Sequence, residues 1–109
     1  MSTVIENLER MLGNGQDSPM LRFGLGKAYL TSKDFQKAAE HLENAIDQDP
    51  EYSAAWKLLG RAYMQSARTD EAIRSFAQGI KVAEQKGDIQ AAKEMGVFIK
   101  RLEKSSDTD

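Results

Sequence analysis

The sequence predicts an all-α protein of about six helices. Apolar side chains recur along most of the 109-residue chain at spacings of three and four residues, which places them on one face of a helix. Short polar segments with glycine or proline separate these stretches and indicate where helices end. The chain also repeats itself with a period of 34 residues. Together these observations predict antiparallel helix pairs, stacked within a single domain at residues 1–109.

The 34-residue period is clearest around Trp56, Leu59 and Tyr63, which share one helix face with the small Gly60 between them. The same residue types recur one period earlier in the same register. The matched pairs are Leu25 with Leu59, Gly26 with Gly60, Tyr29 with Tyr63, Ala38 with Ala72, Leu42 with Phe76, Ala45 with Gly79 and Ile46 with Ile80. Because so many matches keep one register, they predict two copies of one helix-turn-helix unit.

These residues resemble the tetratricopeptide repeat, a 34-residue unit of two helices with Trp, Leu-Gly and Tyr on its first helix. The second copy carries Trp56 but has Glu84 at the position of the final proline. The first copy carries Pro50 but has Arg22 at the position of the tryptophan. The resemblance implies a right-handed stack of antiparallel helix pairs, a tetratricopeptide-repeat-like α-solenoid, of the kind formed by small stand-alone bacterial members of the family.

The segment at residues 3–17 is interpreted as the second helix of an N-terminal half-repeat. Its apolar stripe keeps the register of the later second helices: Val4, Leu8, Met11 and Leu12 lie 34 residues before Ala38, Leu42, Ala45 and Ile46. Glycines at positions 13 and 15 end this helix. The first helix of the same unit is missing.

Repeat one is expected at residues 19–52. Its first helix has Ser18 as a cap and Pro19 in the first turn, where proline is well tolerated. The chain turns at Lys33 into a second helix, which ends before Pro50 because proline cannot continue a helix.

Repeat two, at residues 53–86, is expected to follow the same plan. A last helix at residues 88–104 stands where the first helix of a third repeat would begin, but Lys93 and Glu94 replace its Leu-Gly pair. We interpret this helix as a C-terminal cap. The polar residues 105–109 are expected to form a disordered tail.

Composition argues against several classes of site and partner. The chain has no cysteine, which excludes disulfides, zinc-thiolate sites and thiol nucleophiles. Fifteen basic and seventeen acidic residues give a net charge of −2, which argues against nucleic acid as a partner. Neither a secretory signal nor an apolar run of membrane-spanning length is present, so we expect no membrane association and a cytoplasmic location.

His41 is the one histidine, and we expect it to face solvent beside Glu40 and Glu43. No serine or acid is placed by motif to complete a catalytic triad with it. The acidic residues around it are typical of a solvated helix face rather than a metal site. We therefore predict a protein that is not an enzyme, with no catalytic residue, metal or cofactor; an enzyme or regulator acting through His41 is the minor alternative.

The resemblance implies a binding face on the concave side, lined by the first helices, for an extended or helical peptide. The residues expected there are Met20, Phe23, Lys27, Leu30, Lys57, Leu58, Arg61, Met64, Gln65, Met95 and Phe98. Lys57 and Arg61 lie four residues apart on one helix face, so both can reach one carboxylate. The alternative is that these cations only keep the helix soluble.

We expect a non-catalytic scaffold that binds a protein or peptide, preferably an acidic segment, as a monomer or weak homodimer. Exposed apolar residues on the concave face would supply affinity, and its cations would orient the acidic segment. The alternative is a homo-oligomeric structural module, which assembles through Met95 and Phe98 of the C-terminal helix.

Overall fold

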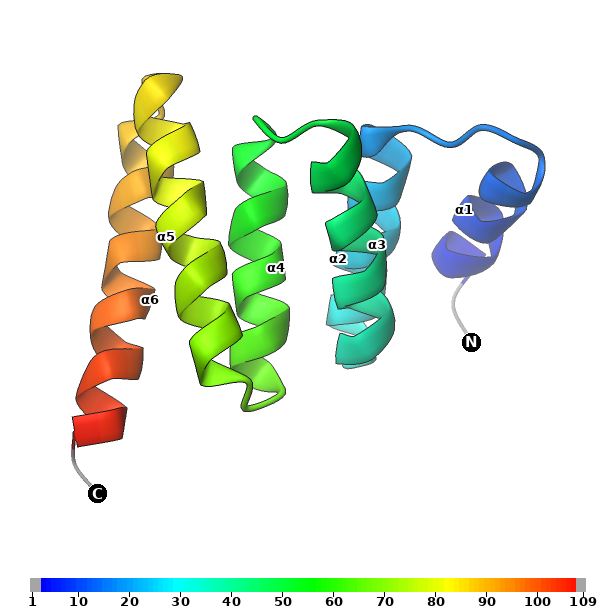
Figure 1. Ribbon diagram of the computed structural model, residues 1–109. Coiled ribbons are helices and arrows are strands. Elements are labelled where there is room, and N and C mark those ends of the chain that lie inside the picture. Colours follow the sequence, from blue (N-terminus) through cyan, green and yellow to red (C-terminus); the bar gives the residue numbers. More distant parts are fainter. Residues whose placement is uncertain (1–2, 108–109) are drawn as a thin grey trace.

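The computed structural model describes residues 3–107, and this part of the chain folds into six α-helices without a strand (Figure 1). The helices are α1 (Thr3–Gly13), α2 (Pro19–Thr31), α3 (Phe35–Gln48), α4 (Ser53–Gln65), α5 (Thr69–Gln85) and α6 (Ile89–Asp107). The predicted all-α fold is confirmed. None of the described helices is long and apolar enough to cross a membrane.

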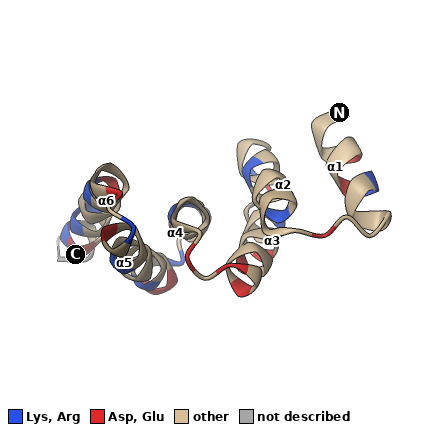
Figure 2. Cartoon of the chain, turned by 90° about the horizontal axis from the view of Figure 1, so that it is seen from above, with Lys and Arg blue, Asp and Glu red and all other residues tan. Residues whose placement is uncertain are grey.

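The helices stack side by side in chain order. α2 packs on α3, α3 on α4, α4 on α5 and α5 on α6, while α4 also touches both α2 and α6. Seen from above, α2, α4 and α6 lie along one side and α3 and α5 along the other, with α4 recessed between its neighbours (Figure 2). The row of α2, α4 and α6 is therefore the concave face of the right-handed stack.

Three tight turns join neighbouring helices with the same backbone geometry. Lys33, Ala67 and Gly87 adopt positive φ values of 65°, 62° and 78°. In each turn the following N–H donates to a carbonyl five residues back: Asp34 to Tyr29 at 2.9 Å, Arg68 to Tyr63 at 2.8 Å and Asp88 to Ala83 at 2.8 Å. This hydrogen-bond pattern is typical of helices that end at a residue in the left-handed backbone conformation. The chain thus turns from α5 into α6 with the geometry that joins the two helices within each repeat.

The glycines of the repeat lie where two helices cross closely. The side chain of Leu42 covers Gly26, and the ring of Phe76 covers Gly60. A Cβ atom added at either glycine would lie 2.4 Å from the covering side chain. The packing therefore requires glycine at both sites, although glycine lowers helix propensity by about 1 kcal/mol relative to alanine.

The C-terminal helix α6 is longer than the sequence predicted. It continues to Asp107, so residues 105–107 are helical and the prediction of a disordered tail is wrong for them; residues 108–109 lie outside the described part. Neither glycine nor proline interrupts the chain after Leu102, and Lys104 in the last turn complements the negative end of the helix dipole. Local sequence thus favours continuation of the helix.

Candidate partner-binding surface

The inner face, meaning the concave surface of α2, α4 and α6, exposes most of the residues predicted for it. Met20, Lys27 and Gln65 are exposed, and Phe23, Lys57, Arg61, Met64 and Phe98 are partly exposed. Leu30, Leu58 and Met95 are buried, so the prediction that these three line an open surface is wrong. Leu30 and Leu58 belong to the buried apolar core, and Met95 packs against Gly79 of α5.

Lys57 already holds a carboxylate from its own chain. Its Nζ atom lies 2.7 Å from Oε1 of Glu94 on α6, and the Gln90 side chain donates to the other oxygen of that carboxylate at 3.3 Å. The hydrogen bond from Lys57 lowers the pKa of the Glu94 carboxyl group. This position of the inner face therefore binds carboxylate, although the charge of Lys57 is partly neutralised within the fold.

A groove of about 360 Å³ lies between α4 and α6, which we call the α4–α6 groove. It is lined by Lys57, Arg61, Glu94, Val97, Phe98 and Arg101. Within the described residues, the side chains of Arg61 and Arg101 have no hydrogen bond or ion pair. Val97 is exposed, and the Phe98 ring stacks on Phe76 with 5.1 Å between ring centroids. The groove thus combines an apolar floor with cations free to bind.

Sequence reasoning missed Val97 and Arg101 as lining residues of this groove. Together with Glu94 they recur at helical spacings of three and four along α6, which was the available signal. Lys27 lies one 34-residue period before Arg61, is exposed and has no side-chain partner among the described residues. Figure 2 shows basic segments on α2, α4 and α6, and acidic segments on the outer side of α3.

Arg22 occupies the place of the repeat's tryptophan and is paired on two sides. It donates from Nε and Nη2 to the two carboxylate oxygens of Asp17, each at 2.9 Å, and from Nη1 to Nδ1 of His41 at 3.2 Å. The hydrogen bond from Arg22 is the main cause that lowers the pKa of Asp17 to about 2. This cluster ties the segment before α2 to α3.

His41 does not face solvent, so that prediction is wrong. Its side chain is only 12% exposed, its ring stacks on Tyr29 and its Nε2 atom lies 3.7 Å from a carboxylate oxygen of Glu9. Burial is the main cause that lowers its pKa. The equivalent position one period later is the buried Ser75, a small polar residue that gave no clear signal.

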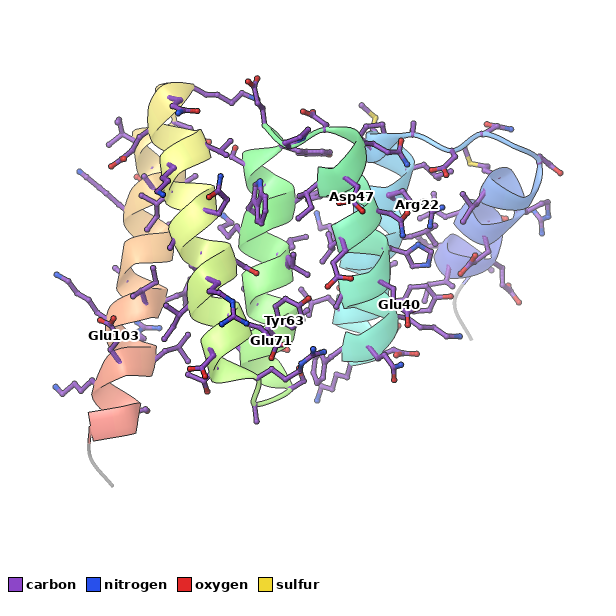
Figure 3. All side chains as sticks on the ribbon, viewed as in Figure 1. Arg22, Glu40, Asp47, Tyr63, Glu71 and Glu103 are labelled. Atoms are coloured by element: carbon purple, nitrogen blue, oxygen red, sulfur yellow. The ribbon has the colours of Figure 1, made fainter. Side chains whose placement is uncertain are left out.

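Two tyrosines join successive units through carboxylates. The hydroxyl of Tyr29 donates to Glu9 at 2.5 Å, and that of Tyr63 donates to Glu43. Figure 3 shows Tyr63 reaching from α4 towards α3. The donor and the acceptor both recur after 34 residues, and this spacing was the signal by which the sequence could have revealed the bonds. The bond to Glu9 is the main cause that raises the pKa of Tyr29 to about 12.

Acidic residues on the described part of the chain do not gather into a metal site. Within residues 3–107, no group of three or more histidine, aspartate or glutamate side chains is arranged to hold a metal ion. Figure 3 shows two acidic residues of α3, Glu40 and Asp47, at different levels of the helix.

The similarities of the chain to known proteins all lead to one family. Two family models described as tetratricopeptide repeat match residues 29–95 and residues 5–52. A TPR repeat-containing protein of Pseudomonas aeruginosa is 48% identical over 102 residues, which cover 94% of this chain and 97% of that protein.

Two solved structures share the fold. The solution structure of a protein from Bordetella parapertussis has a TM-score of 0.87 and 38% identity, covering 100% of this chain and 95% of that one. The crystal structure of the Sgt2 TPR domain from Aspergillus fumigatus has a TM-score of 0.83 and 30% identity, covering 96% of this chain and 69% of that one.

Proposed function

The chain belongs to the tetratricopeptide repeat family, whose members are typically non-catalytic protein interaction modules, and we propose that it binds an acidic segment of a partner protein in the α4–α6 groove. In this proposal the protein is a scaffold without chemistry of its own. The partner supplies carboxylates to the groove's cations and apolar side chains to its floor.

The carboxylate of Glu94, held by Lys57 beside two unpaired arginines, is the observation that carries this proposal. One carboxylate already binds in the groove, and Arg61 and Arg101 leave room for others. Arginine holds a carboxylate with two parallel hydrogen bonds, which gives the contact a defined geometry. An acidic segment therefore fits this groove better than a basic one.

The apolar floor adds affinity that exposed ion pairs alone do not give. Exposed pairs contribute only about 0.2 to 1 kcal/mol each. Covering Val97 and the free edge of Phe98 removes apolar surface from water, at about 25 cal/mol per Å². A segment that alternates acidic and apolar residues uses both parts of the groove.

Assembly through the C-terminal helix is less well supported, because its two expected anchors are used within the fold. Met95 is fully buried and Phe98 stacks on Phe76. Met95 would have to leave α5 before it could dock on another copy, and the face of the Phe98 ring that stacks on Phe76 is already covered. We therefore place the binding function in the groove.

Reversal of two charges tests this function. We expect R61E/R101E to weaken binding of a dye-labelled peptide of alternating glutamate and leucine by at least about tenfold, or about 1.4 kcal/mol. Lys57 is left unchanged because its reversal would also break the bond to Glu94. Fluorescence anisotropy measures the affinity.

The matched control is R74E/K81E on α5, which makes the same charge change at exposed positions of the outer helix row. It should leave the affinity nearly unchanged. Wild-type binding should also weaken as the Debye length falls from about 30 Å to about 8 Å with added salt. Equal losses in both variants, or binding that salt does not affect, would contradict the proposal.

A further inference from the structure

The N-terminal helix α1 leaves partly or fully exposed the side chains at positions that α3 buries. Its Val4, Leu8 and Met11 are the counterparts, one period earlier, of residues at 0% exposure in α3, namely Ala38, Leu42 and Ala45. Val4 is 58% exposed and Met11 39%. No residue of α1 is buried. In α3 and α5 the equivalent stripe packs on the first helix of the same repeat. Among the described residues, no helix covers the stripe of α1 in this way.

Two pockets mark the place where this first helix would lie. One, of about 320 Å³, is lined by Val4, Gly24, Lys27, Ala28, Thr31 and Ser32. The other, of about 270 Å³, is lined by Leu8, Met11, Gln16, Ser18, Met20 and Leu21. Leu8 lies against Gly24 between them, with 3.6 Å from its Cδ1 atom to the site of an added Cβ. We call this surface of α1 and α2 the N-terminal groove.

The C-terminal helix α6 carries charge at positions where the complete repeats have apolar or small residues. In α6 the positions equivalent to Leu59, Gly60 and Tyr63 are Lys93, Glu94 and Val97, so two of the three carry charge. Repeat proteins need such polar caps at their ends to stay soluble. The described N-terminal end presents apolar side chains instead, including Met20 at 76% exposure. Apolar patches of this kind mark interaction sites.

We propose that the N-terminal groove binds an amphipathic helix of a partner protein, which takes the position that a first helix holds in the complete repeats. The interface continues one already built into the chain, because the bound helix would extend the row of α2, α4 and α6 by one member. The bound helix would contact α2 in the way that α2 contacts α4. It would contact α1 in the way that α2 contacts α3 within a complete repeat.

The repeat itself specifies the chemistry of the bound helix. Leu42 packs over Gly26, and Phe76 over Gly60, so the helix should present glycine or alanine to Leu8. Large apolar residues should flank that small residue, as in the Leu-Gly and Tyr pattern of the complete units. Lys27, which has no side-chain partner within the described residues, lies at the inner rim and favours an acidic residue on the partner.

A second copy of the chain fits this groove poorly. Its α6 is the one first helix without a second helix of its own, but that helix carries Glu94 where glycine is required. Pairing of two α1 helices would join stripes only 11 residues long. A specific dimer usually buries about 1,200 Å² or more in total, beyond the reach of so short a contact.

The chain's own α4 sequence supplies the probe. A synthetic peptide of residues 53–65 carries the Leu-Gly and Tyr pattern, and an Arg61→Glu change in it gives Lys27 a carboxylate. Titrated into the labelled full-length protein, this peptide should shift the amide signals of α1 and α2. A peptide that also carries Gly60→Phe should bind at least about tenfold more weakly, because the phenyl group meets Leu8.

Protein variants keep the test independent of peptide folding. V4D/M11D places charge on two exposed side chains, so the fold should persist by circular dichroism while binding falls at least about tenfold. Ile89→Asp, at a residue with 53% exposure on α6, is the matched control and should bind normally. R61E/R101E should also bind normally, which separates this groove from the α4–α6 groove.

Three results would overturn the proposal. They are shifts confined to α4 and α6, equal affinity of the two peptides, and an unliganded dimer in light scattering that V4D/M11D dissolves. The last would assign the N-terminal groove to a second copy.

Discussion

At the scale of single residues, Arg22 shows how the fold accommodates a departure from the repeat pattern. The guanidinium stands where the second repeat has Trp56, and it is held by Asp17 and by His41. An unpaired arginine at a half-buried site would be destabilising, because burying a charge is unfavourable without a partner. The sequence shows the substitution but not the partners, which come from a loop and from a different helix.

The tyrosine bonds were within reach of sequence reasoning, whereas the environment of His41 was not. Glu9 and Glu43 share the 34-residue period of the two tyrosines that they bind. His41 has no counterpart with similar chemistry in the second repeat. Its burial depends on how α1 and α2 close over α3, which no local pattern specifies.

The cluster around His41 and Asp17 makes stability depend on pH in two separate steps. Burial holds the pKa of His41 below its ordinary value of 6.5, so the folded protein binds that proton less readily than the unfolded chain. The contribution of neutral His41 to the free energy of unfolding is therefore complete above pH 6.5, and it declines as the pH falls below that value. The pKa of Asp17 is lowered from 3.8 to about 2, chiefly by the hydrogen bond from Arg22. The stability that Asp17 contributes is therefore lost only as the pH falls from 3.8 to about 2.

Urea denaturation at a series of pH values measures both steps. His41→Gln should remove the loss of unfolding free energy that begins as the pH falls below about 6.5, and keep the loss due to Asp17 at lower pH. Asp17→Asn should do the reverse. If the unfolding free energy of His41→Gln still fell as the pH dropped just below 6.5, the role given to the buried His41 would be contradicted.

At the scale of helices, local patterns predicted most of the structure. The stripes, the proline after α3 and the turns at Lys33 and Ala67 lie where sequence placed them, because each depends on neighbours a few residues away. The predicted end of α6 was wrong, because the polar residues after Lys104, without glycine or proline, are compatible with either a helix or a disordered tail. Contacts between helices are less local, as the burial of Leu58 shows.

Glycine at the helix crossings should be needed for packing despite its poor helix propensity. Gly60→Ala should lower the free energy of unfolding by about 1 to 3 kcal/mol, because the new Cβ would lie 2.4 Å from Cε1 of Phe76. Gly96→Ala in α6 has no atom within 4 Å of its new Cβ and should raise that energy by up to about 1 kcal/mol. Thermal and urea unfolding compare the two variants. Changes of the same sign in both would contradict the crossing geometry.

At the scale of the whole molecule, the two ends of the stack differ. Figure 1 shows α1 at one end of the stack and α6 at the other. Charged Lys93 and Glu94 replace the Leu-Gly pair in α6, while Val4 and Met11 of α1 are exposed. The sequence predicted a half-repeat at each end. It did not reveal which end would be open, because that depends on comparing burial at equivalent positions.

This asymmetry should appear in amide hydrogen exchange. The amides of α1 should exchange fastest among the helices, because α1 has no buried residue and lies at the end of the stack beside α2. The amides of α4 and α5, in the middle of the stack, should exchange slowest. Protection of α1 equal to that of α4 would show that the N-terminal end is already closed.

The inner face illustrates what sequence can and cannot predict about a binding surface. The period alone places Lys27 and Arg61 at equivalent positions on one row of helices. The pairing of Lys57 with Glu94 and the burial of Met95 depend on where α6 lies, which required the structure. Charge on the inner face was therefore predictable, and the shape of its groove was not.

A residue-resolved amide-shift titration of the full-length protein with the alternating glutamate and leucine peptide tests the central proposal most directly. We predict the largest shifts at Arg61, Val97 and Arg101, saturating with one affinity and weakening with salt. Shifts confined to α3 and α5 on the convex side would contradict it.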